Sequence, residues 1–167
     1  MKEKIFRKYL EIKHPRDLSK VEKPSEKYSV EMADPKDFQL NKFFYKNIGK
    51  SCQWVDRLVW TDIKWIKYVS AENLFTYILK DNQEFAGYFE LLFDQNSKEA
   101  EIAYFGILEE YFGKRLGGYL LSEAINKSFI MKSSRVWVHT CSLDHKNALN
   151  NYLSRGMKIF RSETLIR

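Results

Sequence analysis

The spacing of apolar residues changes along the chain, and the first half shows mainly a helical period. Between residues 36 and 70 apolar positions recur at roughly helical spacing. Asp34-Pro35 and Thr61-Asp62 are typical helix starts, which predicts two helices here, the first with Asp34 as its N-cap. Two short strands, near 9–12 and 28–32, are predicted before the helices.

From Leu74 onward the period falls to two, which predicts a meander of three antiparallel strands at 74–79, 84–93 and 100–108. A glycine-rich segment then leads into alternating helices and strands. The predicted helices lie at 119–131 and 144–155, the latter with Asp144 as its N-cap, and the predicted strands lie at 135–141 and 157–160. The order predicts a mixed α/β (α+β) domain with one central sheet and about four helices.

Length and composition narrow the class of protein. The 167 residues, 44% hydrophobic and 30% charged, are typical of one soluble globular domain, which we expect to span 1–167. No apolar run approaches the ~20 residues that span a bilayer, and the charged start lacks the apolar middle of a signal peptide. We therefore expect a cytoplasmic protein without a membrane partner, with Cys52 and Cys141 as reduced thiols.

The charge of the chain is concentrated near its start. The net charge is +6, and residues 1–28 carry nine Lys or Arg against five Asp or Glu, which is +4 of that total. Basic and acidic residues alternate finely in this segment, so it does not form a clean phosphate-binding stripe. We expect a basic strand and loop over 1–27 with a solvated face, and nucleic acid as a partner is not favoured.

The glycine-rich segment 113–118 is the clearest chemical signal. It follows a predicted strand and opens a predicted helix, where backbone N–H groups lack partners and the helix dipole is positive. Glycines let a bulky anion approach this backbone, and Lys114 and Arg115 add charge. A phosphate cradle and a plain tight turn both remain open from glycine spacing alone. The spacing matches neither a P-loop nor a dinucleotide-binding fingerprint.

The segments 101–108 (EIAYFGIL) and 111–121 (YFGKRLGGYLL) resemble the central motif of the GNAT acetyltransferase superfamily. That family's pattern, Q/R-x-x-G-x-G/A at the end of its fourth strand, runs here from Phe112 to Gly117. Downstream, 148–157 (ALNNYLSRGM) is similar to the family's A-x-x-x-Y-x-x-x-G-F. The resemblance covers 72–163 well and the first 70 residues only in the order of elements.

Three residues depart from the family's pattern. Phe112 replaces the usual Gln or Arg, Arg115 replaces the first glycine, and His145 stands where many relatives have Asn. A residue other than glycine can donate the same backbone N–H if its φ stays negative, and an arginine at this position could pair with a phosphate oxygen. The departures in the loop are therefore compatible with phosphate binding.

The resemblance implies a mostly antiparallel mixed sheet whose fourth and fifth strands, here 100–108 and 135–141, splay apart around acetyl-CoA. The pantetheine arm would pair with backbone near Phe105 and Ile107, in an acyl-CoA-binding core over 72–163. The residues implied to bind the cofactor are Phe105, Gly106, Ile107, Phe112, Gly113, Lys114, Arg115, Leu116, Gly117, Gly118, His145 and Ala148.

By the same resemblance, a primary amine would attack the thioester directly, which requires a base and an acid. Tyr152 matches the family tyrosine that protonates the thiolate, although a buried tyrosine is often simply core. Glu101 matches a general-base glutamate, although it could be an exposed strand acid. His139 and His145 are alternative bases.

Two other chemistries use the same part of the chain. His139 and Cys141 lie two residues apart on one strand, so a Cys–His nucleophile pair is an alternative. Together with Asp144 and His145 they could also hold a metal, but their spacing is not that of a known zinc module, and no metal is expected.

The acceptor is the least determined part. We expect residues 28–70 to form the acceptor side, with substrate-binding residues Tyr45, Trp54, Asp56, Arg57 and Trp60. Their aromatic rings and acids could cage a cationic amine, or they could be packing. The sequence thus predicts an N-acetyltransferase acting on a small-molecule or peptide amine, with a homodimer implied by resemblance only. The alternative is a non-catalytic acyl-CoA-binding module on the same fold.

Overall fold

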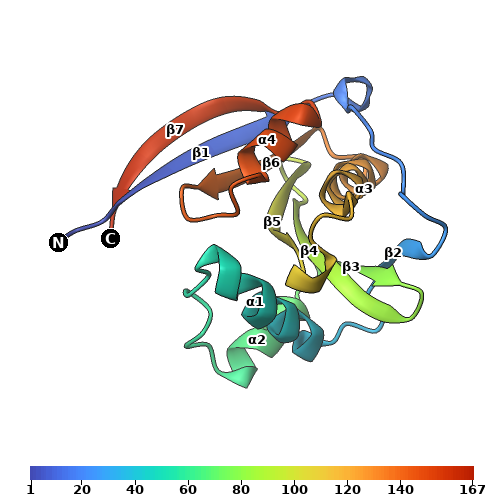
Figure 1. Cartoon of the computed structure of the whole chain (residues 1–167), viewed down its shortest axis with the longest axis horizontal. Helices are drawn as coiled ribbons and strands as arrows, with labels where there is room; N and C mark the ends of the chain where they lie inside the picture. Colours follow the sequence, from blue (N-terminus) through green and yellow to red (C-terminus); the bar gives the residue numbers. More distant parts are fainter.

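The predicted meander forms the centre of one seven-stranded sheet in the computed structural model, which describes all residues 1–167 (Figure 1). The strands are β1 (Lys4–Ile12), β2 (Tyr28–Met32), β3 (Leu74–Asp81), β4 (Glu84–Asp94), β5 (Glu99–Ile107), β6 (Arg135–Cys141) and β7 (Lys158–Ile166). Their order across the sheet is β2-β3-β4-β5-β6-β1-β7. All neighbours pair antiparallel except β5 and β6, which confirms the mixed, mostly antiparallel sheet.

Four helices cover this sheet, as predicted. They are α1 (Phe38–Cys52), α2 (Asp62–Val69), α3 (Leu116–Ile130) and α4 (Ala148–Ser154). Helix α3 packs against β4, β5 and β6, and α1 and α2 lie on the opposite face (Figure 1). Strand β4 is consequently buried from Ala86 to Leu91 without the polar alternation of a half-exposed strand.

Three predicted boundaries were wrong. Asp34 does not cap α1, because Asp37 does: its side chain accepts a hydrogen bond from the Gln39 N–H (2.9 Å) directly before the apolar stripe begins. Asp144 does not cap α4, because its carboxylate accepts hydrogen bonds from the Thr140 hydroxyl (2.6 Å) and the Cys141 N–H (3.1 Å). Helix α3 begins at Leu116, so Gly117 and Gly118 belong to its first turn.

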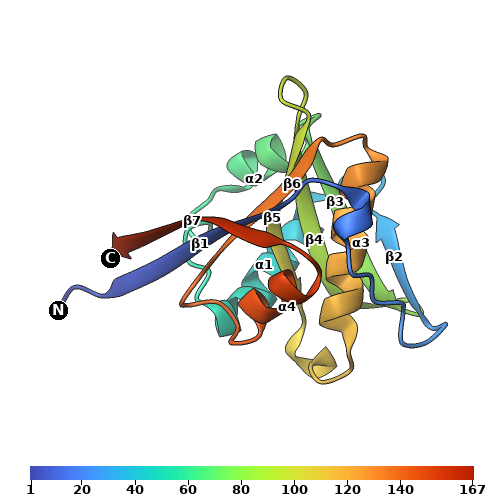
Figure 2. The ribbon, with the colours of Figure 1, turned by 90° about the horizontal axis from the view of Figure 1, so that it is seen from above.

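Strands β1 and β7 are longer than predicted because they pair with each other, which the apolar period of either strand alone does not show. The N-terminal strand β1 lies between β6 and β7, and the β1–β7 ribbon extends away from the body of the molecule (Figures 1 and 2). No helix in the structure has both the length and the apolar character needed to cross a membrane.

The sheet opens between β5 and β6. Only three residue pairs join these parallel strands, the last being Glu101 with Trp137. Just beyond it, β5 carries an extra residue relative to β4: Glu90 faces Tyr104 and Leu91 faces Ile102, which leaves Ala103 unpaired. A bulge of this kind bends its strand, and here it coincides with the point where β5 leaves β6. The predicted splay is therefore confirmed, and it creates the site.

Candidate active site

The splay between β5 and β6 opens into a cavity of about 1340 Å³. Its lining comes from both strands, the start of α3, α4, the loop after α1 and the β1–β7 ribbon. The volume exceeds the range usual for small-molecule sites, about 300–1,000 Å³, so the cavity has room for a large cofactor together with an acceptor.

One end of the cavity is the N-terminus of α3, which has no side-chain cap and no acidic residue in its first turn. Helices α1 and α2, by contrast, are capped by the side chains of Asp37 and Thr61. The first N–H groups of an α-helix lack partners within the helix, so those of α3 remain available to an anion.

The backbone before α3 is left-handed at two residues, Gly113 (φ 75°) and Arg115 (φ 62°). The φ of Arg115 is thus positive, so the condition of a negative φ is not met at this residue. Arg115 keeps the conformation that glycine adopts easily, at a strain cost of roughly 1 kcal/mol, because α3 must begin immediately after it.

Eleven of the twelve residues implied to bind the cofactor line this cavity. The exception is Lys114, whose ammonium lies over the Tyr111 ring, 5.6 Å from its centroid. Phe112 lies edge-on to His145, with ring centroids 5.1 Å apart, and the His145 Nδ1 accepts a hydrogen bond from the Asn147 N–H (3.1 Å). The substituted positions Phe112 and His145 therefore form one wall of the cavity.

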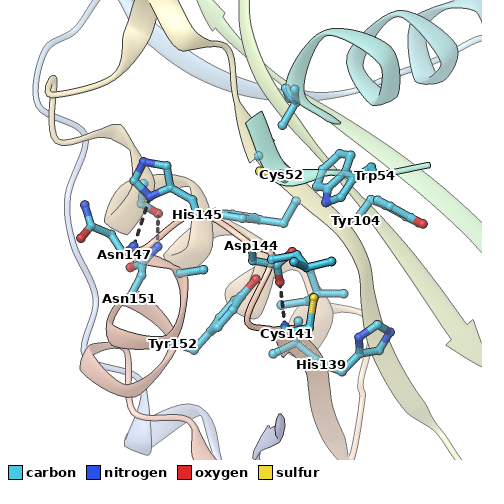
Figure 3. A pocket seen from close by; sticks show the side chains of 18 of the residues that line it. Cys52, Trp54, Tyr104, His139, Cys141, Asp144, His145, Asn147, Asn151 and Tyr152 are labelled. Carbon is cyan, nitrogen blue, oxygen red and sulfur yellow. Dashed lines mark hydrogen bonds between the residues drawn. The ribbon is translucent and has the colours of Figure 1, made fainter. Parts of the chain in front are cut away.

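Tyr152, on α4, reaches the cavity from the side opposite β5 (Figure 3). Its ring is buried, 6.4 Å from the Phe105 ring by centroids, and its hydroxyl points toward Asp144 in Figure 3. Burial, assisted by the nearby Asp144 charge, raises the pKa of Tyr152 well above its usual value. The phenol therefore keeps its proton at neutral pH but is a weaker acid than an exposed tyrosine, so its candidacy as a proton donor rests on its position in the cavity.

Glu101 also lines the cavity, at the last pair between β5 and β6. Burial raises the pKa of its carboxyl, and the charge of Arg57 opposes part of that rise. A raised carboxyl pKa makes a carboxylate a better proton acceptor. The structure thus brings the predicted base and the predicted acid to one cavity.

The two alternative chemistries find less support in this geometry. Burial raises the pKa of the Cys141 thiol, which is opposite to the change that activates a nucleophilic cysteine. His139 lines the cavity, and desolvation together with the Arg7 charge lowers its pKa. The Asp144 carboxylate, a candidate metal ligand, already accepts hydrogen bonds from Thr140 and Cys141. Because a lowered pKa keeps its imidazole neutral, His139 remains an alternative base.

The other end of the cavity adjoins a buried charge network centred on Glu90, which is 0% exposed. Its carboxylate accepts hydrogen bonds from Asn41 Nδ2 (2.9 Å), Tyr68 Oη (2.7 Å) and Arg57 Nη1 (3.2 Å). Burial disfavours the Arg57 charge, but the Glu90 carboxylate and the neighbouring tyrosines Tyr68, Tyr104 and Tyr88 together hold the pKa of Arg57 above its usual value. Arg57 therefore keeps its charge in the interior of the protein, 3.2 Å from a Glu90 carboxylate oxygen.

Two of the aromatic residues predicted to cage a cationic acceptor, Trp60 and Tyr45, lie over Arg57 instead, together with Tyr68 and Tyr104. Its guanidinium carbon lies 4.0 Å from the centroid of Tyr104, 4.2 Å from Tyr68 and 4.7 Å from Trp60. Of the predicted substrate-binding residues, Trp54, Asp56 and Arg57 line the cavity, whereas Tyr45 and Trp60 do not. The Tyr45 hydroxyl accepts a hydrogen bond from the Arg57 N–H (2.9 Å).

Sequence reasoning missed Glu90, Asn151 on α4 and Arg155 directly after α4. A single acid within the apolar strand segment FAGYFELLF (85–93) was the available signal for Glu90, because acids are almost never fully buried unless they are paired. Asn151 Nδ2 donates to the Gly117 carbonyl (3.0 Å), and Arg155 lies beside it. No pattern in the sequence marked these two contacts.

The cavity thus lies between two parallel strands and is lined by the uncapped start of α3, Glu101 and Tyr152. Residues 38–157 match the model of the acetyltransferase (GNAT) family, and the chain belongs to that family. The resemblance of its motifs is thereby confirmed. Among curated proteins, none matches the sequence.

Solved structures share this fold at low sequence identity. A GCN5-related N-acetyltransferase from Sphaerobacter thermophilus superposes with a TM-score of 0.72 at 15% identity, covering 97% of this chain and 50% of that one. One from Kribbella flavida gives 0.67 at 12%, covering 96% and 56%. An aminoglycoside acetyltransferase from an uncultured soil metagenomic sample gives 0.65 at 13%, covering 80% and 90%. This chain thus spans about half the length of the first two.

Proposed function

We propose that this protein is an N-acetyltransferase that moves the acetyl group of acetyl-CoA to a primary amine by direct attack on the thioester. The observation that carries the proposal is the uncapped first turn of α3, which faces the same cavity as Tyr152 and Glu101. Phosphate binding and proton transfer are thereby combined in one cleft.

The residues of the cleft fit acetyl-CoA. The donors of 113–118 suit a pyrophosphate, because a helix start presents unpaired N–H groups and a positive dipole. Past the pair of Glu101 with Trp137, β5 has no partner on the β6 side, so backbone at Phe105 and Ile107 can pair with an extended amide-containing arm. When bound, acetyl-CoA would supply an activated acyl group.

Proton transfer is assigned to two side chains. Glu101 accepts the proton of the attacking amine, for which its raised pKa is suitable. Tyr152 donates a proton to the departing thiolate, and its buried phenol holds that proton at neutral pH. Because the pKa of Cys141 is raised rather than lowered, the chain offers no activated thiol for an acyl-enzyme, which supports direct attack.

The acceptor is proposed to enter beside Trp54 and Asp56, which line the same cavity as Glu101. The exposed Asp56 carboxylate can attract a protonated amine, and Trp54 can contact its apolar part. The Arg57 side chain takes up the neighbouring aromatic faces, so Tyr45 and Trp60 support this wall from behind rather than touching the acceptor.

The test is release of free CoA thiol from acetyl-CoA by the purified chain, with polyamines, amino sugars, aminoglycosides and peptide N-termini as acceptors. We expect release with at least one class of primary amine, and none when that amine is already acetylated. Binding of acetyl-CoA without turnover on any amine would contradict catalysis and support the non-catalytic acyl-CoA-binding module.

A further inference from the structure

The arginines of this chain differ in how their charges are balanced. Four of the eight are buried or half-buried, namely Arg7, Arg57, Arg135 and Arg155. The first three each lie within 3.5 Å of a carboxylate oxygen. Arg155 takes part in no ion pair: its Nη1 donates to Asn151 Oδ1 (3.3 Å), and its Nε is buried without a partner. Partial burial of a cation without a counter-charge costs free energy of folding, so a role in binding an anion would explain why Arg155 is placed here.

The Arg155 guanidinium lies against the first turn of α3. A Cβ placed on Gly118 would be 2.4 Å from Arg155 Nη1, so glycine at this position leaves the room that the guanidinium occupies. Asn151 joins the two elements, because it accepts from Arg155 and donates to the Gly117 carbonyl (3.0 Å). Arg155, Asn151, Gly117 and Gly118 all line the cavity.

Two positively charged features therefore lie side by side in the cavity wall. The start of α3 carries the positive end of a helix dipole and the open N–H groups, and the charge of Arg155 lies beside it. Burial lowers the pKa of Arg155, and no carboxylate offsets this. The C-terminal end of α4, where Arg155 lies, stabilises a cation only in part, since its dipole is that of a seven-residue helix. An anion bound between guanidinium and helix start would stabilise both.

We propose that Arg155 binds a phosphate group of the acyl-CoA cofactor, together with the backbone amides that open α3. This inference rests on the proposed function, because it assigns a further ligand in the same cleft. Arg155, directly after α4, then supplies a positive charge beside these amides; Asn151 accepts a hydrogen bond from its guanidinium, and Gly118 leaves room for it.

Calorimetric titration of the purified chain and of Arg155→Gln tests the proposal with three ligands: acetyl-CoA, its 3′-dephospho form and S-acetylpantetheine, which has no phosphate. We expect Arg155→Gln to weaken acetyl-CoA binding on the order of tenfold or more, and to leave S-acetylpantetheine binding unchanged. A loss that persists with the 3′-dephospho ligand assigns Arg155 to the pyrophosphate, and a loss that disappears assigns it to the 3′-phosphate.

The control is Arg161→Gln, on the exposed strand β7, which removes the same charge outside the cavity and should bind acetyl-CoA as the unaltered chain does. Equal acetyl-CoA affinity of Arg155→Gln and the unaltered chain would overturn the inference and leave the proposed function standing. Equal weakening of all three ligands would also overturn it, since that result indicates a structural role. Failure of the unaltered chain to bind acetyl-CoA would remove the proposed function itself.

Arg155→Lys is a second variant that tests the proposal if Arg155→Gln fails to fold. It keeps the charge but loses the fork of donors, so we expect it to fold and to recover part of the lost affinity for acetyl-CoA. If Arg155→Gln does not show a cooperative thermal transition, the lysine variant decides: affinity for acetyl-CoA at the level of the unaltered chain, together with unchanged salt dependence, would overturn the proposal.

Discussion

The two ends of the cavity differ in how their polar groups are paired. At the α3 end, hydrogen-bond donors lack partners within the protein, whereas at the Glu90 end the buried charges form an ion pair with each other. The first turn of α3 has no cap and Arg155 has no carboxylate partner. The fully buried Glu90 carboxylate, by contrast, accepts hydrogen bonds from three side chains. Its partner Arg57 is enclosed by aromatic rings.

The difference separates binding from folding. Groups that are satisfied within the protein stabilise it and are unavailable to a ligand, while unsatisfied groups at a cavity wall cost stability and are available. Variants at the Glu90 end should therefore change the free energy of unfolding, and variants at the α3 end should change ligand affinity at nearly constant stability.

The largest expected effect is at the matched end. Glu90→Ala should lower the free energy of unfolding by about 3–5 kcal/mol, because it leaves Arg57 buried and unpaired. Urea denaturation measures it. The double variant Arg57→Met with Glu90→Leu should recover most of this loss, since replacing both partners removes the unpaired charge. If the double variant is as unstable as Glu90→Ala, the pair is not the source of the effect.

Gly117→Asp should separate ligand affinity from the stability of the fold most clearly. A Cβ at this position would be 3.5 Å from Asn151 Nδ2, an ordinary contact, and an acid in the first turn of a helix is favourable. We expect an unchanged or slightly higher melting temperature together with a loss of acetyl-CoA affinity on the order of a hundredfold, because the carboxylate repels phosphate. Gly117→Asn, neutral and of similar size, should bind much better; equal loss in both would indicate steric blocking.

Tyr152→Phe should lower turnover about a hundredfold while leaving the dissociation constant for acetyl-CoA unchanged. The phenylalanine retains the buried ring and removes only the hydroxyl that faces the cavity. Steady-state kinetics and titration measure the two quantities separately. Unchanged turnover would mean that another group or water protonates the thiolate.

The pH dependence of kcat/KM should reveal which residue is the base. Glu101 works as a base only when deprotonated, and burial raises its pKa above 4.5, so activity should rise with pH through a point above the ordinary carboxyl range. Glu101→Gln should remove this acidic limb. If His139→Gln removes it instead, the base is His139, whose pKa lies below 6.5.

The smallest effect concerns the strained loop. Arg115→Gly should raise the free energy of unfolding by roughly 0.5 kcal/mol, because relief of a positive φ outweighs the larger chain entropy of glycine in the unfolded state. Acetyl-CoA affinity should change little, since the backbone donors remain. A tenfold loss of affinity would show that the Arg115 side chain itself contacts phosphate.

The cofactor end could be predicted from the sequence because it depends on local backbone. A strand, a short glycine-containing turn and a helix start lie within residues 99–118, and their order alone indicates open N–H groups. The acceptor end could not be predicted in the same way. Tyr45 and Trp60 suggested a cage for a ligand, and only the packed structure shows that the Arg57 guanidinium lies over both rings.

By itself the sequence determined the helices, the meander, the glycine segment and the resemblance of its motifs, because these follow from hydrophobic period and residues close together in the chain. The tertiary structure decided what depends on distant residues. It placed β1 between β6 and β7, paired Arg57 with Glu90, and left Arg155 beside Gly118. Charge pairing and sheet order are set by which surfaces meet in the folded chain, and no local period records them.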